Sequence, residues 1–378
     1  MVDLELLSDF WEFLKEKKVE GKKIIAFMAH DNIPEELIDA AGFFPLNLIF
    51  AGNDDVMNAS HDYLPPSTCS FAQSCIGLFS IKPNGFNFLD LIDYFVVSNH
   101  CVLNICASEI ISKYFSIPRL NFYISYTQDA NASDYYRLEL VEFKKQLEEI
   151  KGSEILEEEI SKSIAKYNNF KKKLSDIDKM KVSGNKKLKI FQKAMLYGPD
   201  FIPDLDNFIQ DNQQKESQST NNSKNLLLTG CSIFIGDYLI DLVEESGGNI
   251  VFFDTWVGNS YFCQVFEEDT LNSILNPIEL LVLRFKMNHF GDHSVPFYLE
   301  NKVSQIENII KDYQQKTGKK LAVINHIIKF CDHISIMSTF LKNKLQEKGI
   351  QVLNLERDYS KSIRGQISTR IEAFLEMI

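Results

Sequence analysis

The sequence predicts an α/β fold with two lobes, each built on a short parallel sheet. Short apolar, β-rich runs alternate with helical patterns in both halves of the chain. A long charged segment separates the two sets of runs, and a polar stretch almost free of large apolar residues follows it. Strands that alternate with helices form parallel βαβ units, so each set predicts one sheet of about four strands.

The first lobe is predicted to span residues 1–132. Its strands are expected at four apolar runs, which are KKIIAF (22–27), FPLNLIF (44–50), LIDYFVV (91–97) and RLNFYI (119–124). The segments between these runs are long enough for the helices that parallel strands need as crossovers.

Residues 133–205 are predicted to form long charged helices inserted between the lobes. Apolar residues recur there at roughly helical spacing, with Glu and Lys between them: Leu138, Leu140, Val141, Phe143 and Leu147. The polar stretch 206–224 is the predicted linker, because it carries few side chains that could join a core.

The second lobe is predicted to span residues 225–378. Its strands are expected at NLLLTG (225–230), NIVFFD (249–254), LAVINHI (321–327) and VLNLE (352–356). A last helix should pack on the core through one apolar face, made of Ile367, Ile371, Phe374, Leu375 and Ile378.

Composition and charge restrict the function. The 378 residues are 45% hydrophobic and 24% charged, which is typical of a globular protein. A net charge of −12 argues against nucleic-acid binding, because phosphate contacts need an excess of Lys and Arg. No apolar stretch approaches the roughly 18 residues that span a bilayer, and the N-terminus lacks the pattern of a signal peptide. We therefore expect a cytoplasmic protein that does not bind membranes.

Three of the seven cysteines occupy positions where an open α/β fold gathers its ligands. Cys101 follows LIDYFVVSNH, Cys331 follows LAVINHIIKF, and Cys69 lies in the loop LPPSTCSFAQ. Ligands of open parallel sheets bind beyond the carboxyl ends of the strands, so these thiols could converge there. Three thiolates from three loops suit a cubane iron–sulfur cluster with one iron left open. The alternative is that each is a buried structural thiol.

The remaining cysteines are weaker candidates. Cys75 and Cys106 follow Cys69 and Cys101 on the expected next helices, and we interpret both as structural. Cys231 follows a strand within a glycine turn and is left ambiguous, whereas Cys263 has no supporting context. The absence of a C-x-x-C pair argues against a zinc ribbon or a thioredoxin-type site.

Histidines offer a second kind of site. His30 and His100 lie at strand ends, where either could approach a ligand or donate a proton. His326 and His333 flank Cys331, so a His–Cys zinc or mononuclear iron site is conceivable, although polar residues near a strand end explain them more simply.

Nucleotide chemistry is disfavoured by the glycine pattern. The segment from Gly230 to Asp254 has strand, glycines, helix, strand and a terminal acid, but lacks the full G-x-G-x-x-G spacing. Walker A, H-E-x-x-H and G-x-S-x-G motifs are also absent from the sequence.

Several segments together resemble the 2-hydroxyacyl-CoA dehydratase subunits, a family that includes benzoyl-CoA reductase subunits. IPEELIDAAGFFPLNL, LPPSTCSFAQSCIG and SNHCVLN resemble its helix start and first two cysteine positions, although Val102 stands where the family usually has Asp. The segment from FCDHIS to the end resembles the third cysteine region, and GQISTRIEAF is its most specific part. The length resembles the smaller (beta) of two subunits.

The resemblance implies two flavodoxin- or Rossmann-like lobes with a 4Fe–4S cluster held by Cys69, Cys101 and Cys331. It also implies a related partner subunit, an acyl-CoA substrate and a separate ATP-dependent iron–sulfur activator protein that injects one electron. The implied reaction removes water from an (R)-2-hydroxyacyl-CoA through a ketyl radical and gives a 2-enoyl-CoA. An open iron could also bind the substrate oxygen.

Three alternatives remain open from the sequence. The chain could belong to a benzoyl-CoA-reductase-type enzyme, could relay electrons without binding substrate, or could be a redox-inert α/β binding protein. A double-cubane cluster is disfavoured, because Trp256 stands where a further ligand is expected and HFGDHSVPF offers no cysteine.

Overall fold

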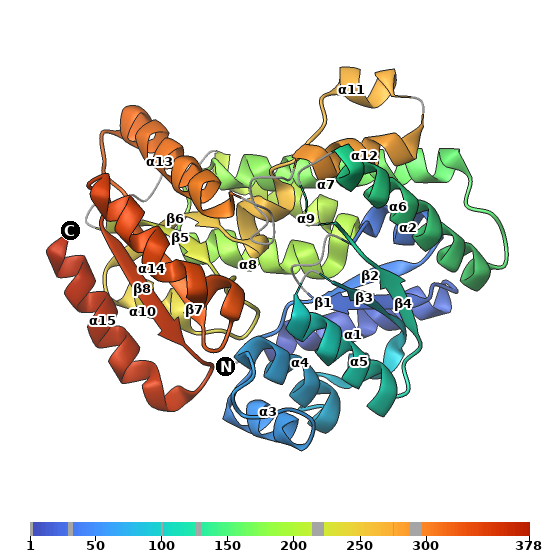
Figure 1. Ribbon diagram of the computed structural model, residues 1–378, viewed down its shortest axis with the longest axis horizontal. Coiled ribbons are helices and arrows are strands. Elements are labelled where there is room, and N and C mark those ends of the chain that lie inside the picture. The colour runs from blue at the N-terminus through green and yellow to red at the C-terminus, as the bar shows by residue number, and fades with distance from the viewer. Residues whose placement is uncertain are drawn as a thin grey trace.

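Two parallel sheets organise the protein, as the sequence predicts. The computed structural model describes residues 3–28, 33–99, 101–125, 127, 130–213, 223–274, 276–287 and 297–378. Within these ranges the α/β prediction is confirmed, with one four-stranded sheet of order β2-β1-β3-β4 and a second of order β6-β5-β7-β8 (Figure 1).

All eight predicted strands are present within a few residues of their expected ends. They are β1 (Ile24–Met28), β2 (Phe44–Leu48), β3 (Ile92–Ser98), β4 (Arg119–Phe122), β5 (Lys224–Gly230), β6 (Gly248–Asp254), β7 (Ala322–Ile328) and β8 (Val352–Arg357). Every residue of β1, β2 and β7 is buried, because helices cover both faces of the sheets. This explains why the sequence shows continuous apolar runs rather than alternation.

Helices surround both sheets and fill the space between them. Those of the first lobe are α1 (Leu4–Val19), α2 (Glu35–Ala40), α3 (Asp54–Ala59), α4 (Ser70–Ile81) and α5 (Val102–Tyr114). The middle segment holds α6 (Ala130–Lys151), α7 (Glu157–Asp178), α8 (Gly184–Tyr197) and α9 (Ile202–Gln213). The second lobe adds α10 (Leu239–Glu245), α11 (Glu268–Ser273), α12 (Pro277–Met287), α13 (Tyr298–Thr317), α14 (Asp332–Glu347) and α15 (Arg364–Met377).

The middle helices differ from the sequence prediction in detail. On α6 the buried stripe contains Leu140, Phe143 and Leu147, whereas Leu138 and Val141 are exposed. The true stripe follows a spacing of three and four residues, which the two exposed residues break. Helix α9 continues to Gln213, inside the predicted linker 206–224, and residues 214–222 of that linker lie outside the described residues.

The loops beyond the carboxyl ends of the two sheets meet. Ala51 N donates to Ile235 O at 2.9 Å and Ile235 N donates to Ile49 O at 2.9 Å, which joins the loop after β2 to the loop after β5. Helix α8 packs against both β2 and β6, between the lobes in Figure 1. One apolar core contains residues of both sheets, so the lobes fold against each other around a shared interior.

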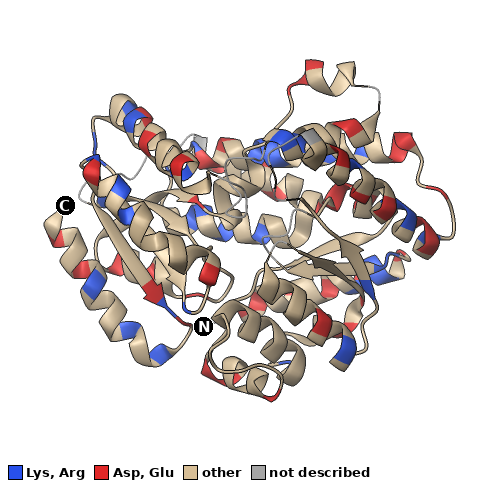
Figure 2. Ribbon diagram, viewed as in Figure 1, with Lys and Arg blue, Asp and Glu red and all other residues tan. Residues whose placement is uncertain are grey.

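Charged residues lie mainly on the helices. Figure 2 shows acidic and basic residues interspersed along the outer helices, whereas the strands are mostly uncharged. Among the described helices, none combines the length and hydropathy needed to cross a membrane.

Candidate functional site

The three cysteines singled out by the sequence share one structural setting. Cys69, Cys101 and Cys331 are the N-cap residues of α4, α5 and α14, and none of them caps its helix through the side chain. A helix N-terminus carries partial positive charge, which favours a thiolate or another anion. The local fold therefore suits each of these sulfur atoms for holding negative charge.

Cys69 and Cys331 come together from different lobes. The first backbone N–H of α4, on Ser70, donates to Lys329 O at 3.3 Å in the loop after β7. The Cys331 side chain lies within hydrogen-bonding reach of the buried Cys69 thiol, and this contact together with burial raises the pKa of Cys69 well above its usual value. A pair of predicted ligands thus meets between the lobes.

The structure adds Cys231 to this pair. Gly230, at the end of β5, has a φ of +88°, and a Cβ there would lie 2.3 Å from His326 O, so only glycine permits this close approach. The following residue, Cys231, is buried, and contact with the Cys331 side chain followed by burial raises the pKa of its thiol well above the usual value. We define Cys69, Cys231 and Cys331 as the thiol cluster.

The remaining cysteines singled out by the sequence differ in burial. Cys101 begins α5 and is half-buried, and its assignment as a ligand stays a prediction. Cys75 is buried in the core on α4, while Cys106 and Cys263 are exposed. His30 and His100 lie outside the described residues.

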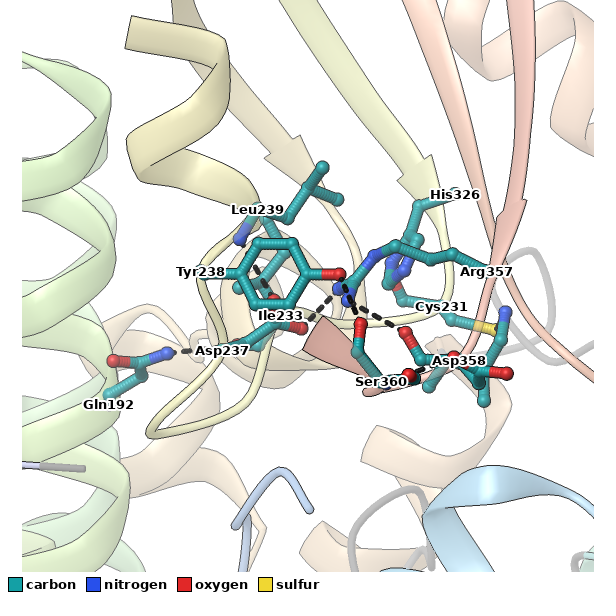
Figure 3. Close-up of polar contacts among 11 residues, drawn as sticks. Gln192, Cys231, Ile233, Asp237, Tyr238, Leu239, His326, Arg357, Asp358 and Ser360 are labelled. Atoms are coloured by element: carbon teal, nitrogen blue, oxygen red, sulfur yellow. Dashed lines mark hydrogen bonds and ion pairs between the residues drawn. The ribbon is translucent and has the colours of Figure 1, made fainter. Parts of the chain in front are cut away.

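A buried polar network lies beside the thiol cluster (Figure 3). His326 Nδ1 is 2.8 Å from Cys231 O, which makes Nδ1 the protonated nitrogen. Burial, followed by the positive charge of Arg357, lowers the pKa of His326 to about 4, so its ring is neutral. Arg357 itself forms a buried ion pair with Asp237.

Some buried polar atoms of this network have no hydrogen-bond partner among the described residues, and Arg357 Nε is one of them. His326 Nε2 and the Tyr359 hydroxyl are buried and have no hydrogen-bond partner within the described ranges. Burial is the main cause that raises the pKa of Tyr359, and the charges of Asp237, Cys69 and Cys231 add to it, so the hydroxyl lies near the thiols. Unsatisfied buried polar groups are uncommon and mark places where a ligand can bind.

The donor set suits an iron–sulfur cluster. Thiolates are soft ligands that hold such clusters, and each binds a different iron, so their sulfur atoms need not surround one point. In the part of the chain that the structure describes, no group of three or more His, Cys, Asp or Glu side chains has the spacing for a single metal ion. The convergent thiols and the orphaned hydroxyl beside them fit a cluster.

A pocket of about 520 Å³, its solvent-open mouth included, lies beyond the ends of β1 and β6. Its walls include Phe27 of β1, Trp256 just after β6, and Phe285 of α12. Both lobes therefore contribute to it. Aromatic side chains and charged or polar side chains both line it.

Four charged side chains lie in or behind this pocket. Glu36 Oε1 pairs with Arg284 and lies 3.5 Å from Lys171 Nζ. Glu35 Oε2 accepts a hydrogen bond from Tyr261 Oη at 2.7 Å. We define Glu35, Glu36, Lys171, Arg284 and Tyr261 as the carboxyl cluster.

The two carboxyl groups differ in charge. Burial would raise the pKa of Glu36, but Arg284 and Lys171 overcome this effect and lower it to about 2. Burial raises the pKa of Glu35 to about 7, because Lys171 offsets only part of the cost and the Glu36 charge opposes ionisation. Glu36 is thus an anion that balances cations, whereas Glu35 can gain or lose a proton near neutral pH.

Sequence reasoning misses the carboxyl cluster. Glu35 and Glu36 lie in a segment whose pattern indicates only a helix start, and Lys171 belongs to a charged helix whose pattern indicates a solvated face. Asp254, the acid at the end of β6, is bound by Lys302 at 2.7 Å and Thr229 at 2.8 Å, so its role is an internal ion pair.

Comparison with known proteins identifies the family of this chain. The family model for "2-hydroxyglutaryl-CoA dehydratase, D-component" matches residues 32–378. A putative dehydratase subunit, YjiM, of Escherichia coli K12 is 23% identical over 364 residues, which cover 92% of this chain and 89% of that protein. The (R)-phenyllactyl-CoA dehydratase beta subunit of Clostridium sporogenes is 23% identical over 378 residues, covering 97% and 94%.

A reductase component is also similar over a shorter stretch. A benzoyl-CoA reductase subunit of Thauera aromatica is 26% identical over 165 residues, which cover 42% of this chain and 40% of that protein. The family match, in contrast, includes both lobes and all three thiols of the thiol cluster. The chain therefore belongs to the 2-hydroxyglutaryl-CoA dehydratase D-component family.

Proposed function

We propose that this chain is the iron–sulfur subunit of a 2-hydroxyacyl-CoA dehydratase-like enzyme. The reaction converts an (R)-2-hydroxyacyl-CoA into a 2-enoyl-CoA and water, and Cys69, Cys101 and Cys331 hold a 4Fe–4S cluster. The observation that carries the proposal is the meeting of buried thiols from both lobes, in a chain whose family consists of dehydratase components.

The chemistry explains why such a protein needs a redox centre. A hydrogen on C3 is barely acidic because C3 is not adjacent to the thioester carbonyl, so simple base catalysis fails. When bound, the cluster would supply one electron to the thioester carbonyl. The resulting ketyl radical anion on the substrate expels the C2 hydroxyl, loses a C3 proton and returns the electron. A related partner subunit and an ATP-dependent activator, both implied by the family resemblance, would complete the system.

Glu35 is our candidate for moving the proton. Its carboxyl group lines the pocket and has a pKa of about 7, which suits a group that must both take and release a proton. Tyr261 fixes one of its oxygens by the 2.7 Å hydrogen bond. Together with Lys171, the Glu36–Arg284 pair gives the carboxyl cluster no net charge when Glu35 is ionised.

The pocket walls would protect the reaction from water. Phe27, Trp256 and Phe285 present aromatic surface around the acidic group. Excluding water strengthens the electrostatic interactions inside the pocket and prevents quenching of a radical.

A benzoyl-CoA-reductase-type activity is the second candidate. The partial similarity to the benzoyl-CoA reductase component of Thauera aromatica favours it. Its electrons would remain in the product, whereas dehydration returns each electron. The consumption of electrons per product therefore separates the two activities.

The test is turnover by the enzyme purified with its partner subunit in the absence of oxygen. Activator, ATP and a limiting amount of reductant are added to a series of (R)-2-hydroxyacyl-CoA esters. Many molecules of 2-enoyl-CoA per electron support the dehydratase. One product per two electrons would show that the enzyme is a reductase and not a dehydratase. No acyl-CoA conversion of either kind would contradict both proposed activities.

A further inference from the structure

Cys231 is fixed in place by its backbone and by its sulfur. Its N–H donates to His326 O at 2.8 Å, and its carbonyl accepts from His326 Nδ1 at 2.8 Å. Its Sγ accepts a hydrogen bond from Ile328 N at 3.3 Å. Backbone N–H groups that donate to sulfur stabilise the negative charge of a thiolate.

The loop after β7 brings the other two thiols to the same place. Ile328, whose N–H binds Cys231, also accepts a hydrogen bond from Cys331 N at 2.9 Å through its carbonyl. The next residue, Lys329, holds the start of α4 through Ser70, directly after Cys69. Residues 328–331 are therefore the common support of the thiol cluster.

We propose that Cys231 is the fourth thiolate ligand of the cluster, completing the set of Cys69, Cys101 and Cys331. This inference rests on the proposed function, because it assumes the cluster itself. A cubane cluster accepts one thiolate on each of its four irons. On binding iron, each thiol releases its proton to solvent and no electron is transferred.

The consequence is a closed cluster. With four thiolates no iron is left open, so the substrate oxygen does not bind iron in this chain. The cluster then passes electrons without coordinating the thioester, and the substrate depends on the pocket of the carboxyl cluster for its orientation.

A second observation supports the position of Cys231. The buried Tyr359 hydroxyl, which has no partner within the described residues, lies near Cys69 and Cys231. A hydroxyl donor without a protein acceptor is explained if sulfur atoms of a bound cluster accept its hydrogen bond. The unsatisfied hydroxyl thus points to a sulfur-rich group beside Cys69 and Cys231.

The test compares Cys231→Ala with Cys75→Ala, a buried cysteine on α4 that the proposal leaves out of the cluster. Wild type and both variants are purified without oxygen with their partner subunit, and iron and acid-labile sulfide are measured for each. The reduced clusters are then studied by electron paramagnetic resonance with and without cyanide, a probe that binds an open iron. A Mössbauer spectrum of the wild-type cluster tests for a distinct fourth iron without any substitution.

The proposal predicts a wild-type spectrum that cyanide leaves unchanged and four irons of one type. Cys231→Ala should either lose iron or give a spectrum that shifts with cyanide, and Cys75→Ala should match wild type. A wild-type cluster that binds cyanide, or a Cys231→Ala spectrum identical to wild type, would overturn the role of Cys231 and leave the proposed function intact. Wild-type protein without iron would overturn both.

Discussion

The thiol cluster and the carboxyl cluster are both largely buried, but they differ in the cations that lie beside them. Contact with the Cys331 side chain, followed by burial, raises the pKa of the Cys69 and Cys231 thiols, and burial raises the pKa of Glu35. The carboxyl cluster has two cations of its own, Lys171 and Arg284. The buried cation beside the thiols, Arg357, is instead paired with Asp237.

The difference lies in where positive charge comes from. Lys171 and Arg284 allow one carboxyl to stay ionised and leave the other close to neutrality, which is a state suited to proton transfer. Among the described residues, the thiol cluster has no such free cation, and in the proposed function a metal that replaces the thiol protons would supply the positive charge. The comparison therefore distinguishes the thiol cluster, for which we propose metal binding, from the carboxyl cluster, for which we propose proton transfer.

Replacing Cys331, which contacts both other members of the thiol cluster, should have the largest effect. We predict that Cys331→Ser abolishes or strongly reduces the iron content, because Cys331 contacts both Cys69 and Cys231. Iron and sulfide analysis of anaerobic protein is the measurement. Cys263→Ser, at an exposed position, is the matched control and should keep its iron. Equal iron in the two variants would contradict the assignment.

Neutralising Glu35 should lower activity without affecting the thiol cluster. Glu35→Gln is expected to lower kcat by about 10²–10⁴-fold, the usual contribution of a general acid or base, while the iron content stays unchanged. Asp39→Asn, on the same helix but outside the pocket lining, is the control and should keep most of its activity. Full activity in Glu35→Gln would remove this residue from the chemistry.

Removing a cation should destabilise the carboxyl cluster. In Arg284→Met the Glu36 charge is buried with Lys171 alone, and we expect a loss of about 3 kcal/mol in the free energy of unfolding. Urea denaturation measures it. Arg137→Met breaks a partly exposed pair with Glu279 and should cost no more than about 1 kcal/mol. Similar losses in both variants would argue against a special cost of burial at Glu36.

The pH dependence of stability should carry the signature of Glu35. Its pKa is about 7 in the folded protein against 4.5 ordinarily, so between these values the unfolded chain releases a proton that the folded protein keeps. Stability should therefore fall as pH rises from about 4.5 to about 7, by at most about 3 kcal/mol. Subtracting the Glu35→Gln curve isolates this contribution, and a flat difference between the two curves would show that Glu35 is ionised at the lower pH.

The strands were predictable because the pattern that marks each of them lies within a few consecutive residues. Each apolar run is buried on both faces by helices, so composition alone marks β1, β2 and β7. The buried stripe of α6 was only partly predictable, because Leu138 and Val141 are as apolar as Leu140 and differ only in which way they face.

The candidate site was predictable for residues whose position in a loop after a strand indicates that they can bind a ligand. Cys69 and Cys331 were identified from their loops and do meet in the structure. Cys231 follows β5 as directly as the others follow their strands, but its place in a glycine turn left its role ambiguous in the sequence. Only the structure shows that Gly230 packs closely against the backbone of His326. Glu35, Lys171 and Arg284 come from helices far apart in sequence, and their mutual effect on pKa depends on a burial that no local pattern reveals.

The central claim is that buried thiols of both lobes hold an iron–sulfur cluster. Its most direct test is the amount of iron and acid-labile sulfide per chain in protein purified without oxygen. The account predicts about four of each, the content of one cubane. Essentially no iron or sulfide, even after reconstitution with both, would contradict it.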